Sequence, residues 1–199
     1  MVISDEIHSD LLFRGQRHTP WPLVSGQSGL NSMVCMAPSK TFNIAGLSTA
    51  FTVSPDPRLK KTFDRMINTL HIQTGNIPGK VALEAAYTHG EEWLNQMMDY
   101  VQGNYRYLEN FISDRLPEIG VMKPEATFLV WLDFRAYGMN DRELNRFLVE
   151  KAKVGLNNGA RFGTGGDGFQ RLNIGCPRSV LKEGLERIYG AFRNFRGSN

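Results

Sequence analysis

A long apolar stripe constrains the fold of this chain more than any other feature. Between about Lys80 and Leu116, large apolar side chains recur at steps of three and four residues, the period of one face of an α-helix. The stripe consists of Trp93, Leu94, Met97, Met98, Val101, Tyr105, Leu108, Phe111 and Ile112. Gly90 and Gly103 are expected to weaken or bend this helix. We predict that the helix joins two domains.

Strand and helix patterns are mixed on both sides of this segment. Short apolar runs predict strands, and apolar residues at helical spacing predict helices. The predicted strands cover residues 2–8, 32–37, 127–134 and 169–174, and the predicted helices cover 59–70, 140–153 and 181–192. Residues 38–40 are expected to form a turn, and Asn140 with Glu143 has the pattern of a capping box. The fold class is therefore α/β or α+β.

Composition excludes several classes of protein. The chain has 199 residues, of which 41% are hydrophobic and 22% are charged, as in an ordinary globular protein. The net charge of +3 is too small and too dispersed to predict nucleic-acid binding. No apolar run approaches the roughly 20 residues that span a bilayer, and no signal peptide is recognisable, so no membrane partner is expected.

Cysteine and histidine usage argues against a disulfide framework and against a metal site. Cys35 and Cys176 are the only cysteines, and they are not spaced for zinc. The four histidines stand at positions 8, 18, 71 and 89, without the spacing of metal ligands. A reducing, cytoplasmic setting fits this usage best.

The segment Ala37–Asn43 holds the main candidate for chemistry. Lys40 stands between small residues just after an apolar strand. A lysine that is partly desolvated there has a lowered pKa, and its free amine is available for Schiff-base formation. The alternative is an ordinary solvated lysine in a surface turn, and the segment alone favours that reading.

Two further charged residues stand in strand patterns. Asp5 alternates with Ile3 and Ile7, so its carboxylate is a candidate for a site at the end of the strand; the alternative is an edge or capping residue. Arg171 lies in the strand of residues 169–174, where its guanidinium needs a partner. A substrate α-carboxylate is one bidentate partner, and an ion pair within the protein is the other.

Taken in order, three motifs resemble one known family. They are Asp-Glu-Ile-His at residues 5–8, Ser-Lys-Thr-Phe-Asn-Ile-Ala-Gly-Leu at 39–47 and Arg-Leu-Asn-Ile-Gly-Cys-Pro-Arg at 171–178. The chain resembles the class I/II aminotransferase fold of pyridoxal-phosphate enzymes, and more narrowly the PatB/MalY group of cystathionine β-lyase-like carbon–sulfur lyases. The resemblance covers essentially the whole chain.

The resemblance implies a role for five residues. Lys40 corresponds to the lysine that forms the Schiff base with pyridoxal phosphate, and Asp5 to the partner of the pyridine nitrogen. Arg171 corresponds to the clamp for the substrate carboxylate. His8 stands where many relatives have a tyrosine near the phenolic oxygen of the cofactor, and Ser39 is a weaker candidate contact for the phosphate.

The resemblance also implies what the chain lacks. The wider family often has serine or threonine three residues before the lysine and arginine eight residues after it, where this chain has Ala37 and Ser48. Such enzymes are nearly twice as long, and the other half supplies the glycine-bearing phosphate loop, the aromatic residue that stacks on the ring and part of the substrate pocket. We expect this chain to be the carboxy-terminal half.

The implied architecture has three parts. Residues 1–85 are expected to belong to the pyridoxal-phosphate-binding large domain, as in aspartate aminotransferase. Residues 86–116 are expected to form the interdomain helix, and 117–199 a small α+β carboxy-terminal domain.

Two other features are candidates for binding. The glycine-rich stretch 159–168 lacks the lysine and the following helix of a P-loop, so we expect a mobile loop near Arg171 rather than a phosphate site. Arg178 falls at the start of the last predicted helix and is expected to face solvent or an ion pair.

The expected activity is pyridoxal-phosphate-dependent β-elimination at an S-substituted cysteine such as cystathionine, by a cytoplasmic homodimer acting on a small amino acid. An aminotransferase is the alternative, because it shares every step through proton abstraction. A second alternative is an inactive fragment that folds or self-associates without cofactor.

Overall fold

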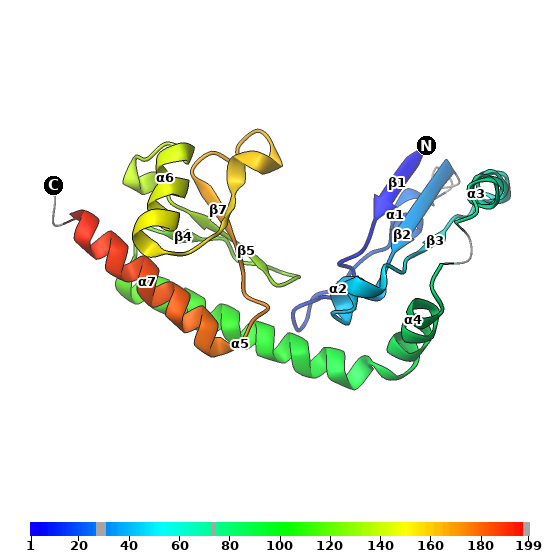
Figure 1. Cartoon of the computed structure of the whole chain (residues 1–199), viewed down its shortest axis with the longest axis horizontal. Coiled ribbons are helices and arrows are strands. Elements are labelled where there is room, and N and C mark those ends of the chain that lie inside the picture. Colours follow the sequence, from blue (N-terminus) through cyan, green and yellow to red (C-terminus); the bar gives the residue numbers. More distant parts are fainter. Residues whose placement is uncertain (27–30, 73–74, 197–199) are drawn as a thin grey trace. The chain divides into compact units, whose positions relative to one another are not determined.

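The computed structural model describes residues 1–26, 31–72 and 75–196 (Figure 1). The chain divides into two compact units, Met1–Met98 and Asp99–Asn199. The boundary between them falls inside helix α5 (Glu91–Arg115). The finer division at residues 85 and 116 stays a prediction.

The first unit is built on a three-stranded sheet in the order β1-β2-β3. Strand β1 (Val2–Asp5) pairs in parallel with β2 (Ser32–Met36), and the register runs as far as Asp5 opposite Cys35. Strand β3 (Phe51–Val53) pairs antiparallel with β2. Because β1 and β2 are parallel, their carboxyl-terminal ends lie at the same end of the sheet.

Short helical segments follow these strands. Helix α1 (Trp21–Ser25) lies in the connection between β1 and β2. Helix α2 (Pro38–Thr41) begins one residue after β2, where a turn was predicted, and a 3₁₀ turn follows at Ala45–Leu47. Proline at the start of α2 suits a helix, because the first turn needs no donor from its amide.

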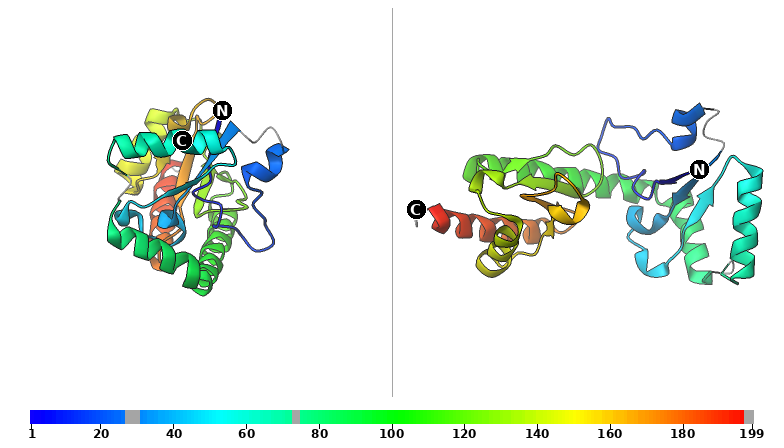
Figure 2. Two further views of the ribbon diagram at one scale, coloured as in Figure 1. Left: turned by 90° about the vertical axis from the view of Figure 1, so that its right-hand side faces the viewer. Right: turned by 90° about the horizontal axis from the view of Figure 1, so that it is seen from above.

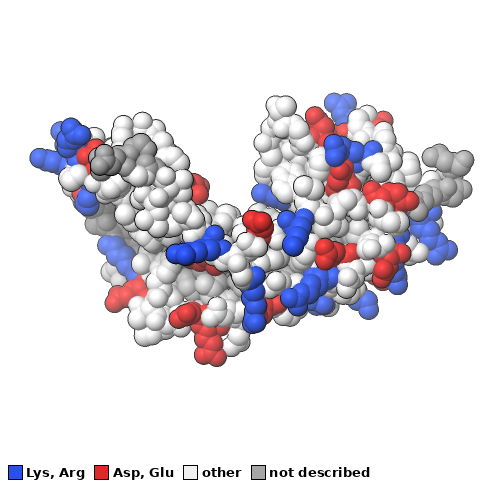
Figure 3. All heavy atoms as spheres, turned by 180° about the vertical axis from the view of Figure 1, so that it is seen from behind, with Lys and Arg blue, Asp and Glu red and all other residues white. Residues whose placement is uncertain are grey.

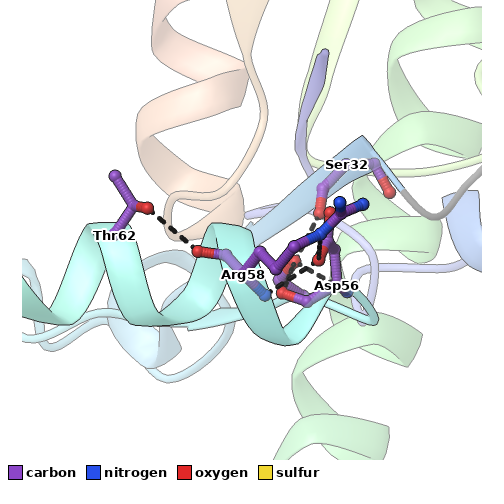
Figure 4. Close-up of polar contacts among 5 residues, drawn as sticks. Ser32, Asp56, Arg58 and Thr62 are labelled. Atoms are coloured by element: carbon purple, nitrogen blue, oxygen red, sulfur yellow. Dashed lines mark hydrogen bonds and ion pairs between the residues drawn. The ribbon is translucent and has the colours of Figure 1, made fainter.

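Helix α3 (Pro57–Thr69) begins at a capped end beside β2 (Figure 4). Asp56 accepts a hydrogen bond from the Arg58 amide at 2.8 Å, which satisfies one of the free donors of the first turn. The Ser54 hydroxyl donates to the Ser32 carbonyl at 2.8 Å and ties this end to β2. One turn on, the Thr62 hydroxyl donates to the Arg58 carbonyl.

The predicted helix from Lys80 to Leu116 is two helices, α4 (Ile77–His89) and α5. The break is at Gly90, whose amide ends α4 by donating to the Ala86 carbonyl at 2.8 Å. A Cβ at this position would lie 2.4 Å from both the Ala86 oxygen and the Phe42 ring, so the site accepts only glycine. Gly103, by contrast, lies within the continuous helix α5.

The second unit contains a four-stranded antiparallel sheet in the order β4-β5-β7-β6. The strands are β4 (Gly120–Val121), β5 (Leu129–Asp133), β6 (Asn157–Asn158) and β7 (Phe169–Asn173). Helices α5 and α7 (Arg178–Arg196) run side by side along one face of this sheet (Figures 1 and 2).

The remaining helix of this unit is α6 (Asp141–Phe147), which continues as a π-helical turn at Leu148–Ala152. The predicted capping box is confirmed: Asn140 and Glu143 exchange side chain-to-amide hydrogen bonds of 3.0 Å.

The core of the second unit lies between the sheet and its helices. Trp131 and Arg171 point to one face of the sheet, whereas Val130 and Leu132 are buried on the other, as alternation along a strand requires. The Phe134 and Phe192 rings stack with centroids 5.5 Å apart. The buried apolar residues are Val101, Tyr105, Leu108, Phe111, Ile112, Leu116, Ile119, Val130, Leu132, Phe134, Leu144, Leu148, Ala152, Ile174, Leu181, Leu185, Ile188 and Phe192.

The first unit buries much less. Helix α3 has no buried residue, and in α4 only Gly79 is buried. The apolar stripe predicted for residues 59–70 is confirmed as helical, but it stays accessible. The most exposed large apolar residues of this unit include Ile3, Met66, Leu70, Ile72, Ile77 and Val81.

Surface charge is mixed. On the face drawn in Figure 3, basic and acidic side chains alternate over the surface. Among the described residues, no helix is apolar over a length sufficient to cross a bilayer. The same residues contain no cluster of three histidine, cysteine, aspartate or glutamate side chains placed for a metal ion.

Candidate active site

Four of the predicted site residues lie at or just beyond the carboxyl-terminal ends of the neighbouring strands β1 and β2. Asp5 is the last residue of β1, and His8 lies three residues beyond it. Ser39 and Lys40 lie in α2, which follows β2 after one residue. The parallel pairing thus places the Asp5–His8 segment beside the Ser39–Lys40 segment, as the order of the motifs predicts.

Lys40 is exposed in this chain, which agrees with the solvated lysine that the segment alone favours. The cause is helix α2, which turns Pro38 and Thr41 inward and Lys40 outward. Among the described residues, the Lys40 ammonium has neither a hydrogen bond nor an ion pair. A lysine left without a partner at a sheet edge is open to a ligand.

Asp5 is also exposed, and among the described residues its Oδ1 accepts a hydrogen bond only from the Ile7 amide, at 3.3 Å. The buried carboxylate of this segment belongs instead to its neighbour Glu6. Ser39 and His8 are half-buried. The structure therefore leaves the carboxylate of Asp5 accessible beyond the end of β1.

Glu6 is a structural carboxylate. It accepts hydrogen bonds from His18 Nε2 at 2.7 Å, from the Trp21 amide at 2.9 Å and from the Ser4 hydroxyl at 3.1 Å. Burial by itself would raise the pKa of Glu6, but the hydrogen bonds from Trp21, His18 and Ser4 together hold its pKa below the ordinary value. Glu6 thus ties the connection that contains α1 to the end of β1.

Arg171 lies in the second unit, on β7, opposite Trp131 of β5 and Asn157 of β6. Its Nη2 donates to the Asn157 amide oxygen at 3.2 Å, and its guanidinium carbon lies 4.4 Å from the centre of the Phe162 ring. Its Nε is buried without a hydrogen-bond partner. Within the described part of the chain no carboxylate pairs with Arg171, so the guanidinium is free for an anionic ligand.

The glycine-rich stretch supplies the wall beside Arg171. Residues Gly159–Phe162 form a 3₁₀ turn, and Gly159 and Gly166 approach so closely that a Cβ on either would lie 2.2 Å from the other's carbonyl oxygen. This contact presents the Phe162 ring to Arg171 and to Trp131. The expected location near Arg171 is confirmed, and its expected mobility stays a prediction.

An apolar hollow of about 320 Å³ adjoins this wall. It is lined by Met122, Trp131, Phe162, Phe169 and the glycine-rich residues 163–166.

Arg178 is the first residue of α7, as predicted, but it faces neither solvent alone nor an ion pair. Its Nε donates to the Asn104 amide oxygen at 2.6 Å, and its guanidinium lies over the Tyr107 ring. Asn104 is completely buried and donates in turn to the carbonyls of Ile174 and Cys176, both at 2.8 Å. Asn104 and Tyr107 thus engage the Arg178 guanidinium, which indicates a structural role for Arg178.

The sequence alone missed the surroundings of Arg171. Asn157 and Phe162 reach it through the β6–β7 register and through the close contact of two glycines. Neither follows from local spacing. The only signal was the glycine-rich composition before the strand.

Comparison with known proteins places this geometry in context. A protein-family model described as aminotransferase class I and II matches residues 1–188. Cystathionine beta-lyase PatB of Bacillus subtilis is 43% identical over 190 residues, which are 96% of this chain and 49% of that protein. Protein MalY of Escherichia coli is 35% identical over 98% of this chain and 50% of that protein.

The solved structures agree in fold. Cystalysin from Treponema denticola, whose crystal structure contains a pyridoxal 5'-phosphate cofactor, superposes with a TM-score of 0.93 at 33% identity, covering 98% of this chain and 50% of that one. A pyridoxal-phosphate-bound C-S lyase from Staphylococcus hominis gives a TM-score of 0.85 at 35% identity. The chain spans about half the length of the curated relatives that it matches.

Proposed function

Because this chain belongs to the aminotransferase class I and II family, we propose that it is one half of a pyridoxal-phosphate-dependent carbon–sulfur β-lyase. The proposed reaction converts an S-substituted cysteine such as cystathionine, with one water, into a thiol, pyruvate and ammonia. The observation that carries the proposal is that the parallel strands β1 and β2 place Asp5 and Lys40, both accessible, on neighbouring segments at the same end of the sheet, in a chain similar to named cystathionine β-lyases.

The donor set fits pyridoxal phosphate. The unpartnered amine of Lys40 suits the aldehyde carbon, and the accessible carboxylate of Asp5 suits a protonated ring nitrogen. The phosphate is less well provided for, because Ala37 is buried and carries no donor and Ser48 offers one hydroxyl. Ser39 would be the remaining phosphate contact in α2, and His8 would be the residue near the phenolic oxygen.

When bound, pyridoxal phosphate supplies an electron sink for the carbanion at the substrate α-carbon. Arg171 binds the α-carboxylate through its planar fork, and the Phe162 ring holds that fork in one orientation. The Lys40 amine would accept the proton released at the substrate α-carbon. The Asp5 carboxylate would hold the protonated ring nitrogen of the bound group.

We further propose that the complete enzyme is a homodimer of the cytoplasm. Free Cys35 and Cys176 fit a reducing compartment. The exposed apolar residues of the first unit fit a chain that is covered by further protein.

The test uses the full-length protein that contains this chain. Lys40→Ala is compared with Lys80→Ala, which removes another exposed lysine of the same unit. Cystathionine is supplied without a keto acid, pyruvate is followed, and borohydride is used to trap the cofactor before peptide mapping. We expect Lys40→Ala to lose at least about a hundredfold in turnover and to lose the trapped peptide, with Lys80→Ala like the wild type.

Two outcomes would redirect the proposal. Cofactor trapped on another lysine in Lys40→Ala would remove Lys40 from its role. Amino transfer that requires a keto acid, with no pyruvate in its absence, would assign the protein to the aminotransferases.

A further inference from the structure

Thr41 is a buried polar side chain next to Lys40. Its side chain is completely inaccessible, and its hydroxyl donates to the Asp10 carboxylate at 3.0 Å. A buried hydroxyl without a partner is costly, so this bond fixes where α2 lies. Since Lys40 directly precedes Thr41 in the same helical turn, the bond also fixes the backbone of Lys40.

Asp10 belongs to the segment that follows β1. The backbone there folds into successive turns, in which the Ser9 amide bonds the Glu6 carbonyl and the Leu11 amide bonds the His8 carbonyl. Leu11 is completely buried and anchors these turns. The Thr41–Asp10 bond therefore links the segment that carries Asp5 and His8 to the helix that carries Lys40.

A third segment joins the same carboxylate. Tyr87 of α4 donates its hydroxyl to the Oδ2 atom of Asp10 at 3.3 Å, the atom that also accepts from Thr41. Burial and the Asp10 carboxylate raise the pKa of Tyr87 to about 12, so its hydroxyl stays a donor at neutral pH. The Tyr87 ring meets the rings of Phe42 and Phe51 edge-on, at 5.5 and 5.9 Å.

We propose that Asp10 is a positioning residue for Lys40, acting through Thr41 and Tyr87. The carboxylate holds α2, α4 and the segment after β1 in one arrangement, and so sets the amine of Lys40 against the carboxylate of Asp5. The inference rests on the proposed function, in which these two groups act on one cofactor.

The variants isolate the carboxylate and each hydroxyl. Asp10→Asn removes the charge, Thr41→Val removes the buried hydroxyl, and Tyr87→Phe removes only the outer one. Thr41→Ser keeps the hydroxyl and is the conservative rescue. Asp64→Asn is the matched control, because Asp64 is a carboxylate of the same unit that pairs with Lys60 on α3.

The first readout is hydrogen exchange, measured by mass spectrometry on the full-length protein without added cofactor. The peptide covering residues 37–44 reports the α2 bonds from Phe42 to Pro38 and from Ile44 to Ser39. We expect its exchange to rise at least about fivefold in Asp10→Asn and Thr41→Val, the factor for one average hydrogen bond. The β2 peptide, residues 31–36, stays unchanged.

The second readout is the rate at which added pyridoxal phosphate becomes borohydride-trapped on Lys40. We expect a fall of about fivefold or more in Asp10→Asn and Thr41→Val, a smaller fall in Tyr87→Phe, and wild-type rates in Thr41→Ser and Asp64→Asn. If Thr41→Val fails to fold, Tyr87→Phe and Asp10→Asn decide the question.

The outcomes separate this inference from the function. Normal trapping in Asp10→Asn together with unchanged exchange overturns the positioning role and leaves the lyase standing. Faster exchange in β2 as well would make Asp10 a general stabiliser and also overturns it. A wild type that never traps cofactor on Lys40 refutes the proposed function, and the positioning role falls with it.

Discussion

Arg171 has a positive charge, a buried Nε and no carboxylate partner in the part of the chain that the structure describes. Lysine at this position keeps the charge but cannot form two parallel hydrogen bonds to a carboxylate, nor stack on Phe162 as a planar group. We expect Arg171→Lys in the full-length protein to raise KM for the amino acid about tenfold, equivalent to about 1.4 kcal/mol. Arg142→Lys, an exposed change on α6, is the control for steady-state kinetics.

One outcome of the Arg171→Lys measurement would contradict the role of Arg171. An unchanged KM in Arg171→Lys would move the carboxylate clamp to another residue. Arg178 is a poor substitute, because Asn104 and Tyr107 already engage its guanidinium.

Glu6 makes the stability of the first unit depend on pH in the acidic range. Its pKa in the folded chain lies below the ordinary value of 4.5, so its contribution to stability is present above pH 4.5. The contribution is lost as the pH falls through the lower, folded-state pKa. We expect the thermal midpoint of the wild type to fall more steeply between roughly pH 5 and pH 3 than that of Glu6→Gln, measured by circular dichroism.

Glu6→Gln should also be less stable than the wild type at pH 7, because the pair with His18 is weakened. If the thermal midpoints of the wild type and of Glu6→Gln changed equally with pH from pH 3 to pH 7, the Glu6 carboxylate would contribute nothing to acid sensitivity.

Asp5 and Glu6 show which features of single residues could be predicted from the sequence. The motif places both carboxylates at the end of an apolar strand, and alternation says that they point to opposite sides. It does not say that Glu6 becomes the buried one, because its partner His18 comes from a loop twelve residues away. Lys40 is similar: the motif makes the residue a candidate, while its exposure depends on the short helix that turns it outward.

At the scale of elements, α5 and α7 are held together at the turn that follows β7. Asn104 is completely buried and makes three hydrogen bonds there, to Ile174, Cys176 and Arg178. Asn104→Ala leaves these groups without their partner, and we expect a loss of about 2 kcal/mol in the free energy of unfolding. Asn95→Ala, an exposed asparagine on the same helix, is the control in urea denaturation. Equal stability of the two variants would show that the amide is dispensable.

Helices were the elements that sequence predicted best. Periodicity gave α7 and α5, and the capping pattern fixed the start of α6, because these signals lie within a few adjacent residues. The sequence predicted only a bend at Gly90, because the Phe42 ring that excludes any side chain there comes from a distant segment. The role of Asn104 could not be foreseen for the same reason, as its partners lie about 70 residues away.

At the scale of the whole molecule, the α/β class and the family were predicted from three motifs and are confirmed. The two units differ in how complete they are. The second unit covers one face of its sheet with α5 and α7 and buries a continuous core. The first unit has a parallel pair, β1 and β2, with Ile3 exposed on β1 and no buried residue in α3. Parallel strands are normally covered on both faces, so this unit calls for additional protein.

The chain by itself should therefore be a poor enzyme. Lys40, Asp5 and Arg171 are present, but the chain spans only about half the length of the relatives that it matches. The resemblance implies that the phosphate loop and the ring-stacking aromatic lie in the other half. An amine held in solvent competes with water for the cofactor, and the open edge of β1 with exposed Met66, Ile77 and Val81 favours association.

We expect the purified 199-residue chain to give no measurable pyruvate from cystathionine with added pyridoxal phosphate, and to elute larger than a monomer in size exclusion with light scattering. Mixing it with the separately expressed other half should restore turnover, because the second polypeptide supplies both the missing site and the missing cover for β1. The same mixture made with Lys40→Ala controls for contaminating lyase. Robust turnover by the chain alone would show that half the family's length holds a complete site, and a monomer would show that the exposed apolar residues need no partner.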